Sequence, residues 1–155
     1  MAGRVEARLA ELGLDLPPPF APAATYEAYV IVGGLVFVSG QGPVWGTEIR
    51  HTGKVGRDLD LAAGREAARL TVLNLVVHLR TACEGDLDRV RRCVKLFGLV
   101  NCGPDFADAE TVVDGACGLL ADLFGEAGRP ALSVTAAPGL PVGIAVELDA
   151  VFEIA

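Results

Sequence analysis

Two strand-like segments at the end of the chain, residues 129–134 and 142–154, constrain its fold more than any other feature. The second segment is almost entirely apolar and rich in β-branched residues, which is typical of a buried strand. We predict that the two segments pair as a hairpin across the turn-forming residues 138–141. Glu147 stands in the middle of the second strand, and an ionised carboxylate away from water is costly unless it is paired or hydrogen-bonded. We therefore expect a specific group to face Glu147.

The rest of the sequence predicts a mixture of helices and strands. At 155 residues the chain is expected to form a single domain, 1–155, with residues 1–22 as an N-terminal helix and a proline-rich connector. Two apolar runs around Gly33 and Gly34 indicate a hairpin, because such two-residue turns need positive φ. Asp60 is the expected N-cap of the longest helix. The predicted elements are helices at 4–13, 61–81 and 107–124 and strands at 26–32, 35–39, 44–51, 89–100, 129–134 and 142–154.

The order of these elements favours a two-layer domain. The helices are few, so we expect the two longer ones to cover one face of a mixed sheet. The chain is 52% hydrophobic with a mean hydropathy of +0.44, which is apolar for a soluble monomer of this size. A bare sheet face would leave a large apolar patch in water. We therefore expect the other face to be buried between the subunits of a dimer or a trimer.

Charge and composition disfavour several classes of function. The net charge is −7, whereas nucleic-acid binders need a basic surface against phosphates, so no nucleic-acid partner is expected. The sequence has no run of ~18 apolar residues and no signal-peptide pattern, so we expect no membrane contact and a cytoplasmic location. The four cysteines lack CxxC spacing and are interpreted as reduced thiols. With two histidines in the chain, a Cys/His metal site is not favoured.

Short motifs in a fixed order carry a resemblance to a known family. They are Phe37-Val38-Ser39-Gly40-Gln41, Gly103-Pro104-Asp105-Phe106, Phe124-Gly125, Pro130-Ala131-x-Ser133 and Val146-Glu147-Leu148-Asp149-Ala150, with Ala67, Asn74 and Leu75 on the long helix. Together they resemble the Rid (YjgF, endoribonuclease L-PSP, imine deaminase) family over residues 26–154. The N-terminal helix and residues 52–56 resemble its longer YjgF-like subgroup.

The resemblance implies an α+β fold, an α/β sandwich of the chorismate-mutase type, with six strands backed by two helices. It also implies a homotrimer, in which three subunits form a barrel with small-molecule clefts between neighbours. In active family members these clefts hydrolyse imines or enamines made from amino acids, and no cofactor is expected. An arginine clamps the substrate carboxylate, a glutamate on the last strand handles the water, and a tyrosine and a serine complete the pocket.

The resemblance carries over to this chain residue by residue, and one essential residue is missing. Glu147 matches the catalytic glutamate, Tyr26 the first-strand tyrosine and Ser39 the serine of the pocket. The clamp does not carry over, because Leu132 stands where the family has arginine. Pro104 stands where active members often have asparagine. A leucine cannot bind a carboxylate and makes the cleft more apolar, which suits a substrate that has no carboxylate.

Several neighbouring residues are further candidates for substrate binding, and each also has a structural interpretation. The candidates are Leu132, Ser133, Asn101, Cys102 and Arg129. Arg129 can instead be a surface arginine paired with Glu126 or Asp122. Cys102 is more consistent with a structural thiol, because no histidine lies near it in sequence to lower its pKa. Glu147 itself can instead be an acceptor for backbone N–H groups.

Two functions are consistent with these residues. The first is the hydrolysis or deamination of an imine, an enamine or a related metabolite, with Glu147 positioning the water. The alternative is a non-catalytic trimer that binds a small apolar metabolite or a protein partner in the same cleft. The ribonuclease or translation-inhibitor role attached to the family name is disfavoured by the net charge of −7 and by the lack of a basic, aromatic surface.

Overall fold

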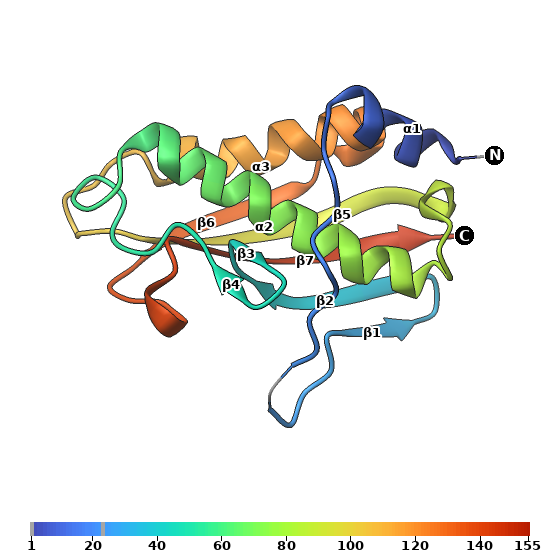
Figure 1. Ribbon diagram of the computed structural model, residues 1–155, viewed down its shortest axis with the longest axis horizontal. Helices are drawn as coiled ribbons and strands as arrows, with labels where there is room; N and C mark the ends of the chain where they lie inside the picture. Colours follow the sequence, from blue (N-terminus) through green and yellow to red (C-terminus); the bar gives the residue numbers. More distant parts are fainter. Residues whose placement is uncertain (1, 23) are drawn as a thin grey trace.

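The elements follow nearly the predicted order in the computed structural model, which describes residues 2–22 and 24–155 (Figure 1). The helices are α1 (Arg4–Glu11), α2 (Leu61–Ala82) and α3 (Ala109–Phe124), and the strands are β1 (Tyr29–Val32), β2 (Leu35–Gln41), β3 (Val44–Trp45), β4 (Glu48–Ile49), β5 (Val90–Asn101), β6 (Ala131–Ala137) and β7 (Val146–Ile154). Single turns of 3₁₀ helix are η1 (Leu87–Arg89), η2 (Gly125–Gly128) and η3 (Pro141–Gly143). Within the described residues, no helix has the length and apolar character needed to cross a membrane.

The last strand, β7, lies at the centre of a mixed sheet with the order β1-β2-β7-β5-β6. All neighbours in this sheet are antiparallel except β5 and β6, which are parallel. Helices α2 and α3 lie together across one face of the sheet (Figure 1). The prediction of a mixed sheet with its two longer helices on one side is therefore confirmed.

The predicted hairpin between residues 129–134 and 142–154 is wrong. Strand β5 lies between β6 and β7, parallel to the first and antiparallel to the second. Helix α3 carries the chain from the end of β5 back to the start of β6, which is the crossover that a parallel pair requires. The apolar pattern identified both strands correctly, but such a pattern does not specify which strand lies beside which.

The predicted strand at 44–51 does not join the sheet, which has five strands in the described part of the chain rather than six. This segment forms a separate small hairpin of β3 and β4, with a turn at Gly46, whose φ is 62°. The side-chain amide of Asn74 on α2 donates to the carbonyls of Gly42, at 3.2 Å, and Val44, at 2.8 Å. The segment is therefore fastened to a helix instead of a strand.

The alternation of side chains along β7 gives the sheet two different faces. The even-numbered residues of β7 are buried beneath the helices, whereas the odd-numbered residues are half-buried on the other side. Leu148 and Phe152 are fully buried in the core, where each such side chain contributes about 1.5–3 kcal/mol through burial. We call the side away from the helices the open face. From β7 it carries Glu147, Asp149, Val151 and Glu153.

Carboxylates fix the beginnings of two helices. Asp60 accepts a hydrogen bond from the Ala63 N–H at 2.8 Å, which confirms it as the N-cap of α2. Helix α1 is capped from a distance, because Asp88 accepts from the N–H groups of Arg4, at 2.8 Å, and Val5, at 3.1 Å. These bonds lower the pKa of Asp88 and attach the N-terminal helix to the domain.

Candidate functional site

A shallow cleft of about 570 Å³ lies on the open face, where β2 pairs with β7. It brings together three residues predicted from the sequence, namely Tyr26 before β1, Ser39 on β2 and Glu147 on β7. The complete lining consists of Tyr26, Val30, Phe37, Val38, Ser39, Gly40, Glu147 and Asp149. Residues that are distant in sequence therefore form one site because three neighbouring segments of the sheet meet there.

A β-bulge shapes the floor of this cleft. Val38 pairs with Ala150, but Gln41 pairs with Leu148, so two residues of β2 stand opposite a single residue of β7. Such a bulge changes the direction of a side chain and is common beside active sites. A Cβ atom at Gly40 would lie 3.1 Å from the carboxyl of Glu147. The glycine therefore leaves room for that carboxyl to lie directly against β2.

Ser39 attaches the Tyr26 segment to the sheet. Its hydroxyl donates to the carbonyl of Glu27 at 2.6 Å, and its backbone N–H donates to the carbonyl of Ala28 at 2.9 Å. These two bonds hold the residues that follow Tyr26 against β2. Because the hydroxyl proton is already engaged, Ser39 Oγ presents acceptor lone pairs to any ligand in the cleft.

The two carboxyl groups of the cleft lack partners. No hydrogen bond or ion pair holds Glu147 or Asp149 within the part of the chain that the structure describes. Burial raises the pKa of both groups, and the charge of Asp149 raises the pKa of Glu147 further. The proposed structural role of Glu147 as an acceptor for backbone N–H groups thus finds no donor in the described chain. Both acids remain able to bind a ligand or a water.

Leu132 does not stand opposite Glu147, where the predicted hairpin of residues 129–134 and 142–154 would have placed it. It pairs with Leu96, whose side chain is fully buried on the helix side, so Leu132 belongs to the helix side of the edge strand β6. The residue that lies level with Glu147, across Leu99 of β5, is Thr135. Leu132 and Glu147 are therefore separated by β5 and lie on different faces of the sheet.

Ser133 also lies outside the cleft. It pairs with Phe97 of β5 on the open face, and its hydroxyl accepts a hydrogen bond from Lys95 Nζ at 2.7 Å. Arg129 follows η2, two residues before β6 begins, with an exposed side chain whose Nε is 3.5 Å from Glu126 Oε1. This ion pair agrees with the structural interpretation of Arg129 as a surface arginine paired with Glu126. Neither residue contributes to the cleft of its own subunit.

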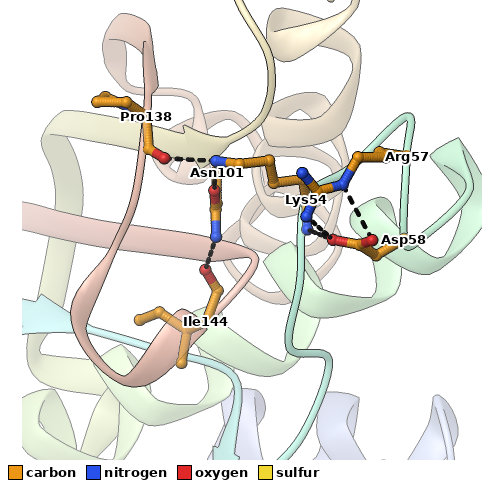
Figure 2. Close-up of polar contacts among 6 residues, drawn as sticks. All are labelled: Lys54, Arg57, Asp58, Asn101, Pro138 and Ile144. Carbon is orange, nitrogen blue, oxygen red and sulfur yellow. Dashed lines mark hydrogen bonds and ion pairs between the residues drawn. The ribbon is translucent and has the colours of Figure 1, made fainter.

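Asn101, at the end of β5, belongs to a polar junction with Lys54, Pro138 and Ile144 (Figure 2). Asn101 accepts from Lys54 Nζ at 2.8 Å and donates to the carbonyl of Ile144 at 3.1 Å. Lys54 Nζ also donates to the carbonyl of Pro138. The junction thus joins the loop after β4 to the ends of β5, β6 and β7. Cys102 is buried beside it, and burial raises the pKa of its thiol, which is unfavourable for a nucleophile.

Sequence reasoning did not identify Asp149, Gly40 or Phe37 as site residues. The signal for Asp149 was present, because residues two apart on a strand point to the same face. Asp149 must therefore accompany Glu147. Gly40 makes room for the Glu147 carboxyl only because β2 and β7 approach closely there. Phe37 lines the cleft only because β2 pairs with β7. Neither can be deduced from a single sequence.

The fold agrees with comparisons to known proteins. The profile of the family described as "YjgF/chorismate mutase-like, putative endoribonuclease" matches residues 6–152. The match spans nearly the whole chain, including every residue of the cleft. The chain therefore belongs to the YjgF/chorismate mutase-like family, whose fold is the one described above.

Individual relatives cover almost the entire chain. Protein TCP17 of Trypanosoma cruzi is 42% identical over 99% of this chain and 96% of its own length. The crystal structure of Atu1372, a protein of unknown function from Agrobacterium tumefaciens, is 40% identical, covers 97% of this chain and 92% of that one, and has a TM-score of 0.92. The "putative endoribonuclease" of Shewanella oneidensis is 33% identical, covers 98% of this chain and 100% of that one, and has a TM-score of 0.94.

If the Lys54 junction is structural, its loss should lower stability. We expect Lys54→Met to lower the free energy of unfolding by about 1–3 kcal/mol, because Asn101 would keep a buried oxygen without its donor. Arg57→Met is the matched control, since Arg57 lies on the same loop and pairs with the exposed Asp58. Urea unfolding measures both variants. Equal stability of the two variants would contradict a structural role for Lys54 and Asn101.

Proposed function

We propose that the cleft hydrolyses or deaminates an imine, an enamine or a related small metabolite, and that neighbouring copies of the chain complete it. The observation that carries this proposal is that Tyr26, Ser39 and Glu147 line one cleft. These are the three positions that match the site of Rid proteins. They come from separate segments, so their meeting is a property of the fold and not of one short motif.

The chemistry assigned to Glu147 is that of a general base. Its carboxyl is half-buried, and its raised pKa makes it a better proton acceptor than an ordinary glutamate. A water held by Glu147 adds its oxygen to the carbon of the C=N bond, and Glu147 takes the proton that the water loses. That proton passes to the nitrogen, which gives a carbinolamine. The hydroxyl proton of the carbinolamine then passes to the nitrogen, again through Glu147, as the C=O bond forms and the C–N bond breaks. The products are a carbonyl compound and ammonia, and no oxidant or reductant is needed.

The partner proposed for the open face is a second and a third copy of this chain. By strand register this face carries apolar side chains that include Val30, 49% exposed, Val32, 62% exposed, and Phe37, 45% exposed. A surface of this kind is costly in water and is typical of an interface. Closed symmetric assembly covers it on every subunit at once. A homotrimer would place the cleft at the border between neighbours.

The alternative is a non-catalytic trimer that binds a small apolar metabolite or a protein partner. The observation that favours it is Leu132, which stands where the family has its arginine. Ribonuclease activity is less consistent with the cleft, because both of its charged residues are acids and would repel a phosphate backbone. A small-molecule ligand suits the cleft better than RNA.

The catalytic proposal is tested with purified protein on 2-iminobutanoate and on imines that lack a carboxylate. We expect turnover of at least one of these compounds and a loss of at least about 100-fold in kcat for Glu147→Gln, since a general base contributes that much or more. Glu153→Gln, on the same face of β7 but outside the cleft, should retain the activity. Activity that is unchanged in Glu147→Gln, or no turnover of any imine, would favour the non-catalytic alternative.

The assembly is tested by native mass spectrometry. We expect the mass of three chains, and a shift towards single chains in Val151→Lys, which places a charge in the middle of the open face. Ile49→Lys is the control, because Ile49 is exposed on the separate β3–β4 hairpin. A single-chain mass for the unaltered protein, or equal masses for the two variants, would argue against the open face as the interface.

A further inference from the structure

All charged groups in the cleft have the same sign. Glu147 and Asp149 are two residues apart on β7 and therefore point to the same side. In the described chain no lysine, arginine or histidine lines the cleft. A ligand with a carboxylate would meet two carboxylates there without a compensating positive charge. A ligand with a positive charge would meet two partners of opposite charge.

Three side chains of the cleft present hydrogen-bond acceptors to a ligand. Carboxylates accept hydrogen bonds and do not donate them. Ser39 has already committed its proton to the carbonyl of Glu27, at 2.6 Å, and so adds a further acceptor. Glu147, Asp149 and Ser39 together form a set of acceptors around one hollow. This set complements a group that carries several N–H donors.

The walls of the cleft also suit a cation. Tyr26 and Phe37 supply aromatic rings, and Val30 adds an apolar surface. Aromatic faces attract ammonium and guanidinium groups, and more so where water is excluded. An apolar wall also strengthens the attraction between a carboxylate and a cation. The walls and the acceptors therefore favour the same kind of ligand.

Three cations of the described chain, each on the sheet or at its edge, are engaged elsewhere. Lys95, on the open face of β5, donates to Ser133 at 2.7 Å. Arg129 pairs with Glu126, and Lys54 donates to Asn101 at 2.8 Å. None of these three residues lines the cleft within the described chain. The two acids thus have no internal partner that a ligand would need to displace.

We propose that the cleft selects an organic cation that has no carboxylate, such as an amine, an iminium or an amidine carrying an apolar or aromatic group. Glu147 and Asp149 bind the positive nitrogen, Ser39 accepts one of its N–H bonds, and Tyr26 and Phe37 contact its apolar part. This inference rests on the proposed function, since it assigns a substrate class to the same cleft. It differs from the carboxylate recognition that an arginine clamp would provide.

Three probes of similar shape test the inference by isothermal titration calorimetry. They are 2-phenylethylamine, which is a cation at pH 7, the neutral 2-phenylethanol and the anionic 3-phenylpropanoate. We expect the amine to bind at least about tenfold more tightly than either of the others, because a hydrogen bond to a charged group contributes that much. Asp149→Asn should weaken amine binding by at least about tenfold, whereas Glu153→Gln should leave it unchanged. Glu147→Gln replaces Asp149→Asn if that variant does not fold.

Several results would overturn the inference. They are equal binding of the amine and the alcohol, no binding of the amine, amine binding that does not depend on Asp149 or Glu147, and a preference for 3-phenylpropanoate. The last result would show that a neighbouring subunit supplies a cation in place of the missing arginine. Hydrolysis of 2-iminobutanoate that depends on Glu147, without amine binding, would overturn this inference and leave the proposed function intact. Amine binding without turnover of any imine would support this inference and contradict the proposed catalytic function.

Discussion

The two-residue period of β7 is the constraint on which the rest of the structure depends. Because β7 is the central strand, its even-numbered side chains must fill the core beneath α2 and α3. Its odd-numbered side chains must then face the side that no helix covers. Leu148 and Phe152 stabilise the domain, while Glu147 and Asp149 project from the same strand into the cleft. The rigid sheet that the core holds in place thus positions the two acids. A shift of one residue in the register of β7 would turn its core side chains to the open face and its acids towards the helices. Both the core and the site would be destroyed.

Much of the fold could be predicted from the sequence because its local signals agree. The Gly33 turn, the Asp60 cap and the apolar periods of α2 and α3 each identify an element without knowledge of its neighbours. Strand pairing was predicted less well, because β6 and β7 follow each other in sequence and yet lie on either side of β5. For the candidate site, too, the residues were identified better than their relative positions, because those positions depend on strand pairing. Tyr26, Ser39 and Glu147 were identified through their resemblance to the family, and they do share a cleft. The position of Leu132 relative to Glu147 depended on pairing and was wrong.

The cleft combines side chains from neighbouring segments of the sheet with charges of a single sign. Tyr26, the bulge at Ser39 and Gly40, and Glu147 on the central strand come together in one cleft. The cleft contains two acids, Glu147 and Asp149, and no positively charged side chain within the described chain. In the proposed function this charge sets recognition without altering the fold, because both acids lie on the surface of an intact sheet. Glu147 can serve as a base for water only while no cation of the protein neutralises it. The lack of a positively charged partner in the described chain is therefore the property on which the proposed catalysis and the proposed ligand choice both depend.

The most direct test of this property is a carbon-detected NMR titration of the carboxyl groups of Glu147 and Asp149 in the ligand-free protein. We predict that both titrate above their ordinary pKa values of 4.5 and 3.8, and that Asp149→Asn lowers the pKa of Glu147 by removing a like charge. A raised pKa means that the native state binds these protons more tightly than the unfolded chain. Each group should therefore reduce stability as the pH rises from its ordinary pKa through its native value. A Glu147 pKa at or below 4.5 would reveal a positive partner in the cleft and contradict the account.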